Sequence, residues 1–469
     1  MSLTGAEPLR NFEYGQIEGP AREALEEIFG DRLSFNESIR GQHGADLSYH
    51  VPQAPDAVAF ANSEAEIVAA VKICAEYQIP VIPYGAGSSL EGHTLAVHGG
   101  LSLDVTQMDR ILSVDPEDFR ATVQAGVTRE ALNHHLRDHG LFFSVDPGAN
   151  ATLGGMSATR ASGTSAVRYG TMRENVMRLR VVLASGEAMD VGSRAKKSSA
   201  GYDLARLMVG SEGTLGVITE VTVNLVPVPE KISSAIVSFE ALPDAVDAAM
   251  SILQAAIPVA RIELLDEVQI RASNAYSKLE LEEKPTLFLE FHGSEAGVEE
   301  QAEMAGALCA EFRSGKFVWA VKTEDRNRLW KARHNAAYAA NAYRPGCRPM
   351  VTDVCVPLSN LAECLLHARD LIDGGSFPAV IAGHVGDGNF HAAFLIDPDN
   401  PMEIEQAHAM NDKIVDKALA CGGTCTGEHG IGLGKRKSLR KEAGDAVHLM
   451  RTIKQALDPG NILNPGKIF

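Results

Sequence analysis

The stretch from His384 to His391 constrains the fold of this chain more than any other. It reads His-Val-Gly-Asp-Gly-Asn-Phe-His and lies between two apolar runs, residues 378–383 and 392–396. Apolar runs separated by Asp-Gly and Gly-Asn are typical of two strands joined by a tight turn. Such a hairpin places both imidazoles near its mouth, where they can share a divalent metal whose expected third ligand is a carboxylate.

A carboxylate of this kind stands downstream, in the stretch Gly427-Glu428-His429-Gly430-Ile431-Gly432. The stretch also supplies a further histidine beside the glutamate. It contributes to a metal site only if the fold brings it to the hairpin. The alternative is that each histidine is an ordinary core or surface residue.

Size and charge limit the class of protein. A chain of 469 residues is too long for one core, so two or three domains are expected. The net charge of −18 argues against a nucleic-acid partner and against docking on an anionic membrane. No stretch approaches the roughly 18 apolar residues of a membrane span, and residues 1–8 lack a signal pattern. A cytoplasmic location is therefore expected.

The seven cysteines are an odd, scattered set and predict no disulfide framework. Cys421 and Cys425 form the only close pair. The pair has the residue types of a metal or redox site, but two free thiols in a Gly-rich loop are the favoured interpretation.

Two Gly-rich segments are candidates for ligand binding. The first, residues 84–92, follows a short buried strand, so consecutive backbone N–H groups can approach a phosphate. It is neither a Walker loop nor a G-x-G-x-x-G fingerprint, and a simple turn is the alternative. The second, residues 147–170, is rich in small residues and has the composition to wrap an extended ligand. Its alternative is a flexible linker.

A domain boundary is expected at residues 227–229, where two prolines interrupt the chain. Strands and helices alternate beyond it, a pattern typical of an open sheet with helices on one face. One long helix is expected over residues 325–342, carrying Arg333, and a strand over residues 351–356. Without further information Arg333 is most simply a solvated helix residue.

Taken together and in order, the motifs HVGDGNFH, GEHGIG and LDPGNILNPGKIF resemble one family. They are similar to those of the FAD-dependent 2-hydroxy-acid dehydrogenases of the vanillyl-alcohol-oxidase/p-cresol-methylhydroxylase (PCMH) superfamily. That group includes the cytochrome-type D-lactate dehydrogenases, the glycolate oxidase flavoprotein subunit and D-2-hydroxyglutarate dehydrogenase. The resemblance extends from about residue 50 to the C-terminus.

The resemblance implies an α+β fold made of a two-subdomain, PCMH-type FAD-binding domain and a ferredoxin-like α+β cap that holds the substrate. The expected bounds are an N-terminal lead-in over 1–50, the FAD domain over 51–229 and the cap over 230–420. Residues 421–469 are expected to form a segment returning to the FAD domain.

It also implies which residues contact FAD. The first Gly-rich segment, residues 84–92, is called the phosphate loop below and would bind the pyrophosphate through backbone N–H groups. The second Gly-rich segment would continue along the cofactor. Residues 210–213 would hold the adenine side, and the C-terminal segment would approach the flavin. The implied contacts are Tyr84, Gly85, Ala86, Gly87, Ser88, Ser89, Gly92, Pro147, Gly148, Thr152, Gly154, Gly155, Ser157, Ser162, Gly163, Tyr169, Gly210, Glu212, Gly213, Gly216, Ile218 and Asn461. No histidine stands within the loop for covalent attachment, so non-covalent FAD is expected.

The resemblance gives roles to the hairpin. His384, His391 and Glu428 would bind zinc or manganese, His429 would act as the base, and Arg333 would hold the substrate carboxylate with Asn389 helping to position it. The metal would lower the pKa of the 2-hydroxyl. The product would be a 2-oxo acid.

The substrate is expected to be a D-lactate-like monocarboxylic D-2-hydroxy acid. The D-2-hydroxyglutarate enzymes tend to carry a lysine just before the aspartate that matches Asp353, whereas Val351 and Thr352 stand there in this chain. Arg348 lies near enough in sequence to keep D-2-hydroxyglutarate open as an alternative. A second alternative is a non-catalytic flavoprotein subunit of a glycolate-oxidase-like complex. An alkyl-ether-lipid synthase is disfavoured because no membrane-binding stretch is present.

The electron acceptor remains open between a cytochrome, a quinone and an electron-transfer flavoprotein. NAD is not expected because the chain carries no dinucleotide fingerprint. A homodimer is the assembly considered.

Overall fold

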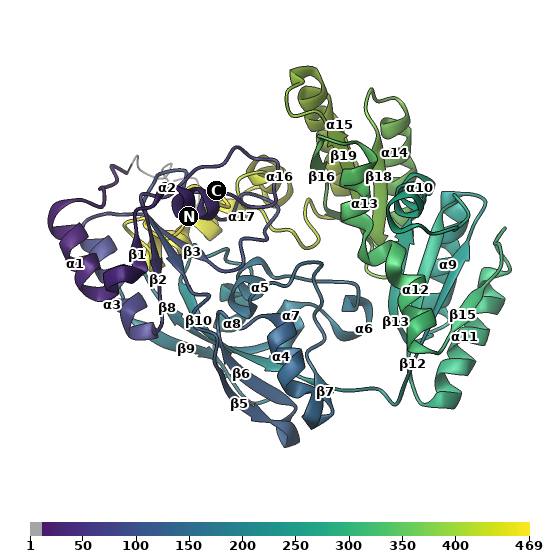
Figure 1. Ribbon diagram of the computed structural model, residues 1–469, viewed down its shortest axis with the longest axis horizontal. Helices are drawn as coiled ribbons and strands as arrows, with labels where there is room; N and C mark the ends of the chain where they lie inside the picture. The colour runs from purple at the N-terminus through teal and green to yellow at the C-terminus, as the bar shows by residue number, and fades with distance from the viewer. Residues whose placement is uncertain (1–11) are drawn as a thin grey trace. The chain divides into compact units, whose positions relative to one another are not determined.

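The computed structural model describes residues 12–469, which form two compact units (Figure 1). The first unit, here called the FAD unit, takes the chain up to Ala161, then residues 171–227 and 428–469. The second, the substrate unit, takes residues 162–170 and 228–427. Residues 1–11 of the expected lead-in lie outside the described residues. The chain passes from the substrate unit to the FAD unit between Gly427 and Glu428, somewhat beyond the expected bound at 420.

A four-stranded sheet forms one half of the FAD unit. Its strand order is β1-β2-β4-β3, with bounds Leu33–Ser34, Ala57–Phe60, Leu101–Asp104 and Val81–Tyr84. The strands β2, β4 and β3 run parallel, so both faces need cover. Helices α1 (Gly19–Phe29) and α3 (Glu64–Glu76) supply apolar faces, of which Leu25, Ile67 and Val71 are fully buried.

A five-stranded antiparallel sheet forms the other half. Its order is β5-β6-β10-β8-β9, with bounds Ile111–Asp115, Arg120–Gln124, Val217–Asn224, Val176–Val182 and Ala188–Gly192. Smaller elements around it are α4 (Arg129–Leu136), α5 (Leu153–Thr159), α7 (Met172–Asn175), α8 (Leu204–Met208), and the paired β7 (Leu141–Phe142) and β11 (Val226–Pro227). One apolar core joins both sheets, so the two halves form one unit.

The C-terminal segment returns to the strand that precedes the phosphate loop. After α16 (Arg436–Ala443) and α17 (Ala446–Leu457), the Asp458 carboxylate accepts hydrogen bonds from the backbone N–H groups of Ile462 and Leu463, at 3.0 and 2.8 Å. Val81 then donates to the carbonyl of Ile462 and accepts from the N–H of Asn464, both at 2.8 Å. The last residues thereby extend the sheet next to β3.

The substrate unit is built on one eight-stranded sheet. Its first strands are β12 (Lys231–Ser238), β13 (Val259–Leu265), β14 (Thr286–Gly293) and β15 (Val318–Ala320), in the order β15-β12-β14-β13. This is the 4-1-3-2 arrangement of a ferredoxin-like fold, with α9 (Leu242–Gln254) and α11 (Glu295–Cys309) as its two helices. Strands β18 (Ala379–His384), β19 (Asn389–Ile396), β16 (Arg348–Val351) and β17 (Val354–Cys355) extend the sheet beyond β13. The expected ferredoxin-like cap is thus present in an enlarged form.

Helices cover both faces of this sheet. Helices α9 and α11 lie on one side, and α12 (Thr323–His334) lies on the other (Figure 1). On the α12 side, Trp330 and Leu329 pack with Ile236 and Phe288 in a small apolar cluster. The remaining helices are α6 (Ala166–Tyr169), α10 (Glu267–Ser277), α13 (Ala336–Tyr343), α14 (Leu361–Asp373) and α15 (Pro401–Ala420). The short α6 lies in the segment 162–170, which was expected to follow the cofactor.

Two expected elements are interrupted. The helix predicted over residues 325–342 breaks at Asn335 (φ −94°, ψ 6°), whose side-chain amide donates to the Ser277 hydroxyl at 3.0 Å. The strand predicted over 351–356 breaks at Thr352 and Asp353, and the Thr352 hydroxyl oxygen accepts a hydrogen bond from the N–H of Ala392. At the second break, the Thr352 side chain satisfies a backbone N–H group that regular structure would otherwise pair.

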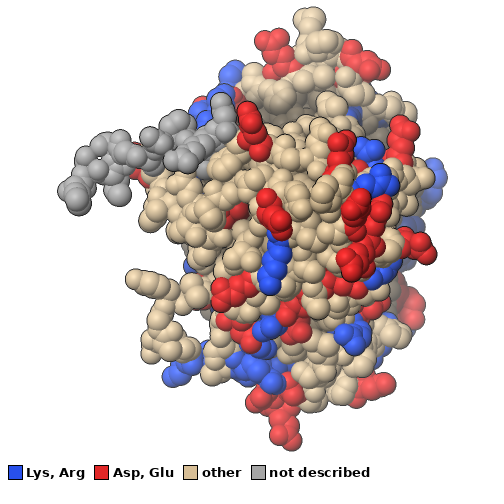
Figure 2. Space-filling view, turned by 90° about the vertical axis from the view of Figure 1, so that its left-hand side faces the viewer, with Lys and Arg blue, Asp and Glu red and all other residues tan. Residues whose placement is uncertain are grey.

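Acidic and basic side chains are interspersed over the face drawn in Figure 2, with wide uncharged areas between them. This face therefore offers no continuous positive field for a polyanion. Among the described residues, no helix combines the length and the apolar character that crossing a membrane requires.

Candidate active site

The hairpin of β18 and β19 carries the two histidines on one face. In its register His384 lies opposite Asn389, and Ala382 lies opposite His391. Residues 389 and 391 are two apart on one strand, so they point to the same side as His384. The two imidazole centroids are 5.5 Å apart, with their planes at 86°. The turn sequence therefore brings both rings together, as the sequence predicts.

Gly388 makes this turn possible. Its φ is +79°, and a Cβ on it would lie 2.1 Å from the carbonyl oxygen of Val356. Any other residue would force the hairpin away from the segment that follows β17.

A buried glutamate that the sequence did not single out orients His384. Leu264 pairs with Gly383 across β13 and β18, so Glu263 falls opposite His384 in the next position. The Glu263 Oε1 atom lies 2.7 Å from His384 Nδ1, and Glu263 is 1% exposed. Because a carboxylate accepts, Nδ1 carries the proton and the lone pair is on Nε2. This hydrogen bond fixes the tautomer in which Nε2 is the atom that can bind a metal ion.

Arg333 contacts the same carboxylate. Its Nε donates to Glu263 Oε2 at 2.8 Å from the last turn of α12. The arginine side chain is only 17% exposed, so it is not a solvated helix residue. Its terminal nitrogens are the pair that commonly forks a carboxylate.

Asp353 organises the other side of the hairpin. Val354 pairs with Phe390 across β17 and β19, which brings Asp353 beside His391. The buried Asp353 carboxylate accepts from the Asn389 side-chain amide at 2.9 Å and from the Thr426 hydroxyl at 2.6 Å. The amide of Asn389 also donates to the Val354 carbonyl at 2.8 Å, so both of its hydrogens are used within the sheet. Only its side-chain oxygen is left to meet a substrate.

His391 is shared by two pairs of possible metal ligands within the substrate unit: His384 with His391, and Asp353 with His391. Within the substrate unit, a ligand atom of His391 lies within 4.8 Å of one on His384 and of one on Asp353.

The chain reaches the hairpin again at Gly427. A Cβ on Gly427 would lie 2.3 Å from Asn389 Nδ2, so only glycine fits against this side chain. Glu428 and His429 follow directly. They are the first residues of the FAD unit after the chain leaves the substrate unit.

The predicted phosphate loop lies in the FAD unit, against the second Gly-rich segment. The loop follows β3, and a Cβ on Gly85 would lie 2.4 Å from Thr152 Oγ1. Thr152 caps α5, where its hydroxyl oxygen accepts from the N–H of Gly155. Gly87 has a φ of +63°. The two segments that were predicted to serve one ligand are therefore in close contact.

Orphaned polar atoms near the loop fit a polar ligand. The buried Ser211 hydroxyl and His93 Nδ1 have no hydrogen-bond partner among the described residues. A long cofactor with phosphate and ribose oxygens supplies such partners. The residues present are thus compatible with FAD.

Several predicted FAD contacts have partners in the protein. Ser157 bonds to the Leu153 carbonyl, and the amide of Asn461 donates to the Tyr14 hydroxyl at 3.0 Å. Ser162, Gly163 and Tyr169 belong to the substrate unit, where the Tyr169 hydroxyl lies 2.7 Å from His292 Nδ1.

Glu212, also predicted to contact FAD, holds the return segment. Its carboxylate accepts from the backbone N–H groups of Ile431 and Gly432, at 2.6 and 2.8 Å, and pairs with His93 at 3.2 Å. Burial alone would raise the pKa of Glu212, but His93 and the two N–H donors outweigh it and lower that pKa. Glu212 in turn raises the pKa of His93, against the effect of burial. This anchor lies just after His429 in the chain.

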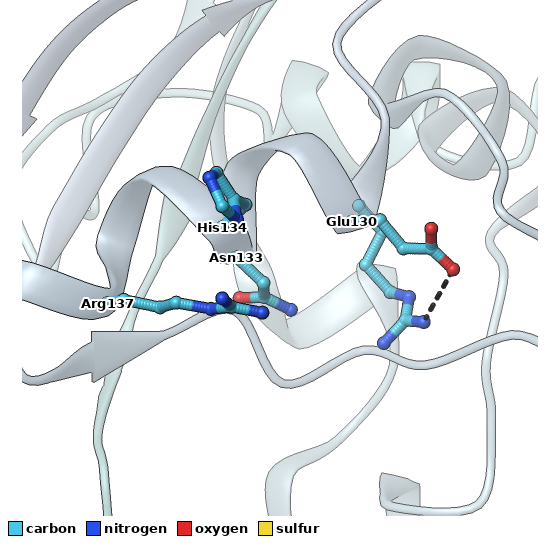
Figure 3. Close-up of a pocket in the computed structure, with 5 residues that line it drawn as sticks. Glu130, Asn133, His134 and Arg137 are labelled. Atoms are coloured by element: carbon cyan, nitrogen blue, oxygen red, sulfur yellow. Dashed lines mark ion pairs between the residues drawn. The ribbon is translucent and has the colours of Figure 1, made fainter.

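A surface pocket lies apart from these residues. Its volume is about 350 Å³. Figure 3 shows the side chains that line it, and those labelled come from α4 and the turn after it. The lining residues are Arg129, Glu130, Asn133, His134 and Arg137. None of them belongs to the predicted set, so the pocket is not part of the candidate site.

Sequence reasoning missed Glu263 and gave no role to Asp353. The signal for Glu263 was an acidic residue inside an apolar strand, residues 259–265, where an unpaired charge is costly. Asp353 stands among apolar residues in the same way.

Comparison with known families matches both units. Residues 55–192 match the family of FAD binding domains, and residues 228–468 match the C-terminal domain of FAD linked oxidases. FAD is therefore the cofactor of this family and of this chain.

Individual proteins are similar over nearly the whole chain. A probable mitochondrial D-lactate dehydrogenase of Danio rerio is 48% identical, over 94% of this chain and 90% of the relative. The mitochondrial D-lactate dehydrogenase [cytochrome] of Arabidopsis thaliana is 44% identical, over 97% and 81%. Glycolate oxidase subunit GlcD of Bacillus subtilis is 35% identical, over 96% of each chain.

Solved structures share the fold at lower identity. p-Cresol methylhydroxylase with substrate bound has a TM-score of 0.81 at 19% identity, covering 96% of each chain. Alkyldihydroxyacetonephosphate synthase has a TM-score of 0.76 at 21% identity, covering 98% of this chain and 88% of that one. Family, fold and the similarity of whole chains agree: the chain belongs to the FAD-linked oxidases and is an FAD-linked 2-hydroxy-acid dehydrogenase.

Proposed function

We propose that this enzyme oxidises D-lactate to the 2-oxo acid, with FAD as hydride acceptor and a divalent metal held by His384, His391 and Glu428. The observation that carries the proposal is the arrangement around Glu263, which holds one predicted metal ligand and the predicted carboxylate-binding arginine on the same buried group. The names of relatives at 44% and 48% identity support D-lactate as the substrate.

The residues divide the work between binding and proton transfer. Arg333 fixes the substrate carboxylate through its terminal nitrogens. His429 takes the proton of the 2-hydroxyl while the C2 hydrogen leaves with its electron pair, so the substrate loses a proton and a hydride. Asn389 keeps Asp353 beside His391 and in this way supports the hairpin.

The two bound groups supply what side chains cannot. The two Gly-rich segments of the FAD unit would hold FAD, which would supply a hydride acceptor. His384, His391 and Glu428 would hold the metal, which would supply Lewis-acid polarisation of the substrate oxygen. Zinc and manganese both suit a site of two imidazoles and one carboxylate.

A monocarboxylic substrate is favoured over D-2-hydroxyglutarate. Thr352 stands where the D-2-hydroxyglutarate enzymes tend to have a lysine, and its hydroxyl is buried and bonded to the N–H of Ala392. It therefore offers no charge to a second carboxylate. Arg348, on β16, is the residue that the alternative would need.

A cytochrome is the proposed electron acceptor, because three of the similar proteins carry that word in their names. A net charge of −18 favours a basic partner through electrostatic steering. The homodimer and the cytoplasmic location remain predictions, and several relatives are named as mitochondrial.

The test is an anaerobic titration of the enzyme-bound flavin with D-lactate, L-lactate, glycolate and D-2-hydroxyglutarate. We expect D-lactate to bleach the flavin fastest and L-lactate to leave it oxidised. Faster bleaching by D-2-hydroxyglutarate would select the alternative substrate. The alternative of a non-catalytic flavoprotein subunit predicts that none of the four acids bleaches the flavin. If none of the four acids bleached the flavin, the assignments of His429 and Arg333 would fall.

A further inference from the structure

We propose that Glu263 is a positioning residue that couples the metal site to the substrate carboxylate. This inference rests on the proposed function, and it assigns a role to a residue outside every recognised motif. Each carboxylate oxygen serves one partner: Oε1 lies 2.7 Å from His384 Nδ1, and Oε2 accepts from Arg333 Nε at 2.8 Å.

The sheet register explains why one residue can reach both. Glu263 sits on β13, beside β18, and points to the sheet face that α12 covers. His384 is the last residue of β18, and Arg333 is near the end of α12. The carboxylate therefore lies between the hairpin and the helix. It contacts Nδ1 rather than Nε2 of the imidazole, and Nε rather than a terminal nitrogen of the guanidinium.

Burial makes these contacts specific. At 1% exposure, Glu263 is shielded from bulk water, so the loss of either partner is costly and its oxygens hold His384 and Arg333 in fixed orientations. Hydrogen bonds of this kind to metal-binding histidines commonly change metal affinity by about 10- to 100-fold. The same group aligns Arg333, so metal binding and substrate binding depend on one side chain.

The neighbouring strand provides a matched control. Glu290 on β14 is also buried, and its carboxylate lies 2.9 Å from His292 Nε2 and 3.2 Å from Arg261 Nη1. It contacts the same two residue types, a histidine and an arginine, but His292 and Arg261 are outside the predicted metal set. Substitution of Glu290 therefore removes a buried carboxylate but leaves the contacts of His384 and Arg333 intact.

The test measures metal affinity directly, by equilibrium titration of the metal-depleted, FAD-loaded protein with Mn²⁺ and Zn²⁺. We expect Glu263→Gln to weaken metal binding by about 10- to 100-fold. Glu290→Gln is expected to leave the metal Kd within about twofold, because a hydrogen bond to a histidine changes metal affinity only where that histidine is a ligand. FAD content and thermal unfolding establish that each variant is folded, and Glu263→Asp replaces Glu263→Gln if the latter does not fold.

Kinetics with D-lactate then test the coupling. At saturating metal, Glu263→Gln is expected to raise KM for D-lactate, and this increase should disappear in an Arg333→Met background. The loss of metal affinity should persist in that background, because it acts through His384. If Glu263 had a merely structural role, Glu263→Gln and Glu290→Gln would both lower stability. They would also change the metal Kd and the KM for D-lactate by equal amounts.

The outcomes separate this inference from the proposed function. If His384→Ala abolishes metal binding but Glu263→Gln leaves the metal Kd and KM unchanged, the role of Glu263 is wrong and the metal site stands. If His384→Ala leaves metal binding unchanged, the metal site itself is wrong.

Discussion

The two units build their candidate sites in different ways. In the FAD unit, the site is mostly backbone: two Gly-rich segments approach so closely that a Cβ on Gly85 would meet Thr152 at 2.4 Å. In the substrate unit, it is made of side chains that neighbouring strands and a helix bring together, around Glu263 and Asp353. A backbone site leaves a local composition that can be recognised, whereas a side-chain site leaves only scattered residues.

Two buried carboxylates make the same contrast. Glu212 in the FAD unit accepts two backbone N–H groups and fixes the course of a segment, the one that starts with Glu428 and His429. Glu263 in the substrate unit binds two side chains and fixes their orientation. Glu212 therefore fixes a backbone path, whereas Glu263 fixes the orientation of two side chains of the candidate site.

The largest effect is expected at the proposed base. His429→Ala should lower kcat by about 10²- to 10⁴-fold, because general-base catalysis is typically worth that much. FAD content should stay at the wild-type level, since we propose that the Gly-rich segments, and not His429, hold the cofactor. Steady-state kinetics and the flavin spectrum measure both. His139→Ala, an exposed histidine on the turn after α4, is the control. A variant that keeps wild-type kcat would remove His429 from the chemistry.

A smaller effect is expected where the two Gly-rich segments meet. Gly85→Ala should weaken FAD binding by about tenfold or more, because the new Cβ has to displace Thr152 and with it the cap of α5. Gly41→Ala in α2 (Glu37–His43) is the matched control, since its Cβ meets open space. Fluorescence titration of the apoprotein with FAD gives the two affinities. Equal affinities would show that this contact does not shape the cofactor site.

The last expected effect concerns stability rather than activity or cofactor binding, and it is the pH dependence of stability of the FAD unit. Lys467 is buried, and its ammonium donates to the Leu95 carbonyl at 2.7 Å and to the side-chain oxygen of Asn464 at 3.2 Å. Burial lowers the pKa of Lys467 to about 7. Between pH 7 and the unfolded pKa of about 10.4, the unfolded chain binds a proton that the folded chain lacks, so stability rises with pH.

This gain disappears in Lys467→Met. The difference in unfolding free energy between wild type and variant should change by up to about 1.4 kcal/mol per pH unit from about pH 7 to 9, in favour of the wild type. Denaturant unfolding at several pH values in this range measures it. Parallel pH profiles would mean that Lys467 stays charged in the fold.

The same contrast explains what sequence reasoning achieved. The hairpin was predictable because its turn residues and both histidines lie within one short stretch. The alternation of strands and helices predicted only an open sheet, and the ferredoxin-like cap was implied by the family resemblance. Glu263 was not, because its partners His384 and Arg333 are 121 and 70 positions away and meet only through strand order. The break at Asn335 depends on a contact with Ser277, which no local propensity contains.

The predicted FAD contacts show what a family resemblance leaves open about individual side chains. The resemblance supplied the ligand, yet it gave Glu212 and Tyr169 to the cofactor, while the structure shows Glu212 bonded to the return segment and Tyr169 beside His292. Side chains in a recognised motif can serve the fold of that motif as well as its ligand. Their direct contact with FAD remains a prediction.

The rate of flavin reduction by D-lactate tests the proposed metal site most directly. It is measured by rapid anaerobic mixing before chelation, after chelation and after re-addition of Mn²⁺ or Zn²⁺. Chelation is expected to leave FAD bound but to slow reduction by at least about 100-fold, since Lewis-acid stabilisation is worth several kcal/mol, and re-added metal is expected to restore the rate. An unchanged rate in protein shown to be free of metal would contradict a metal role for His384, His391 and Glu428.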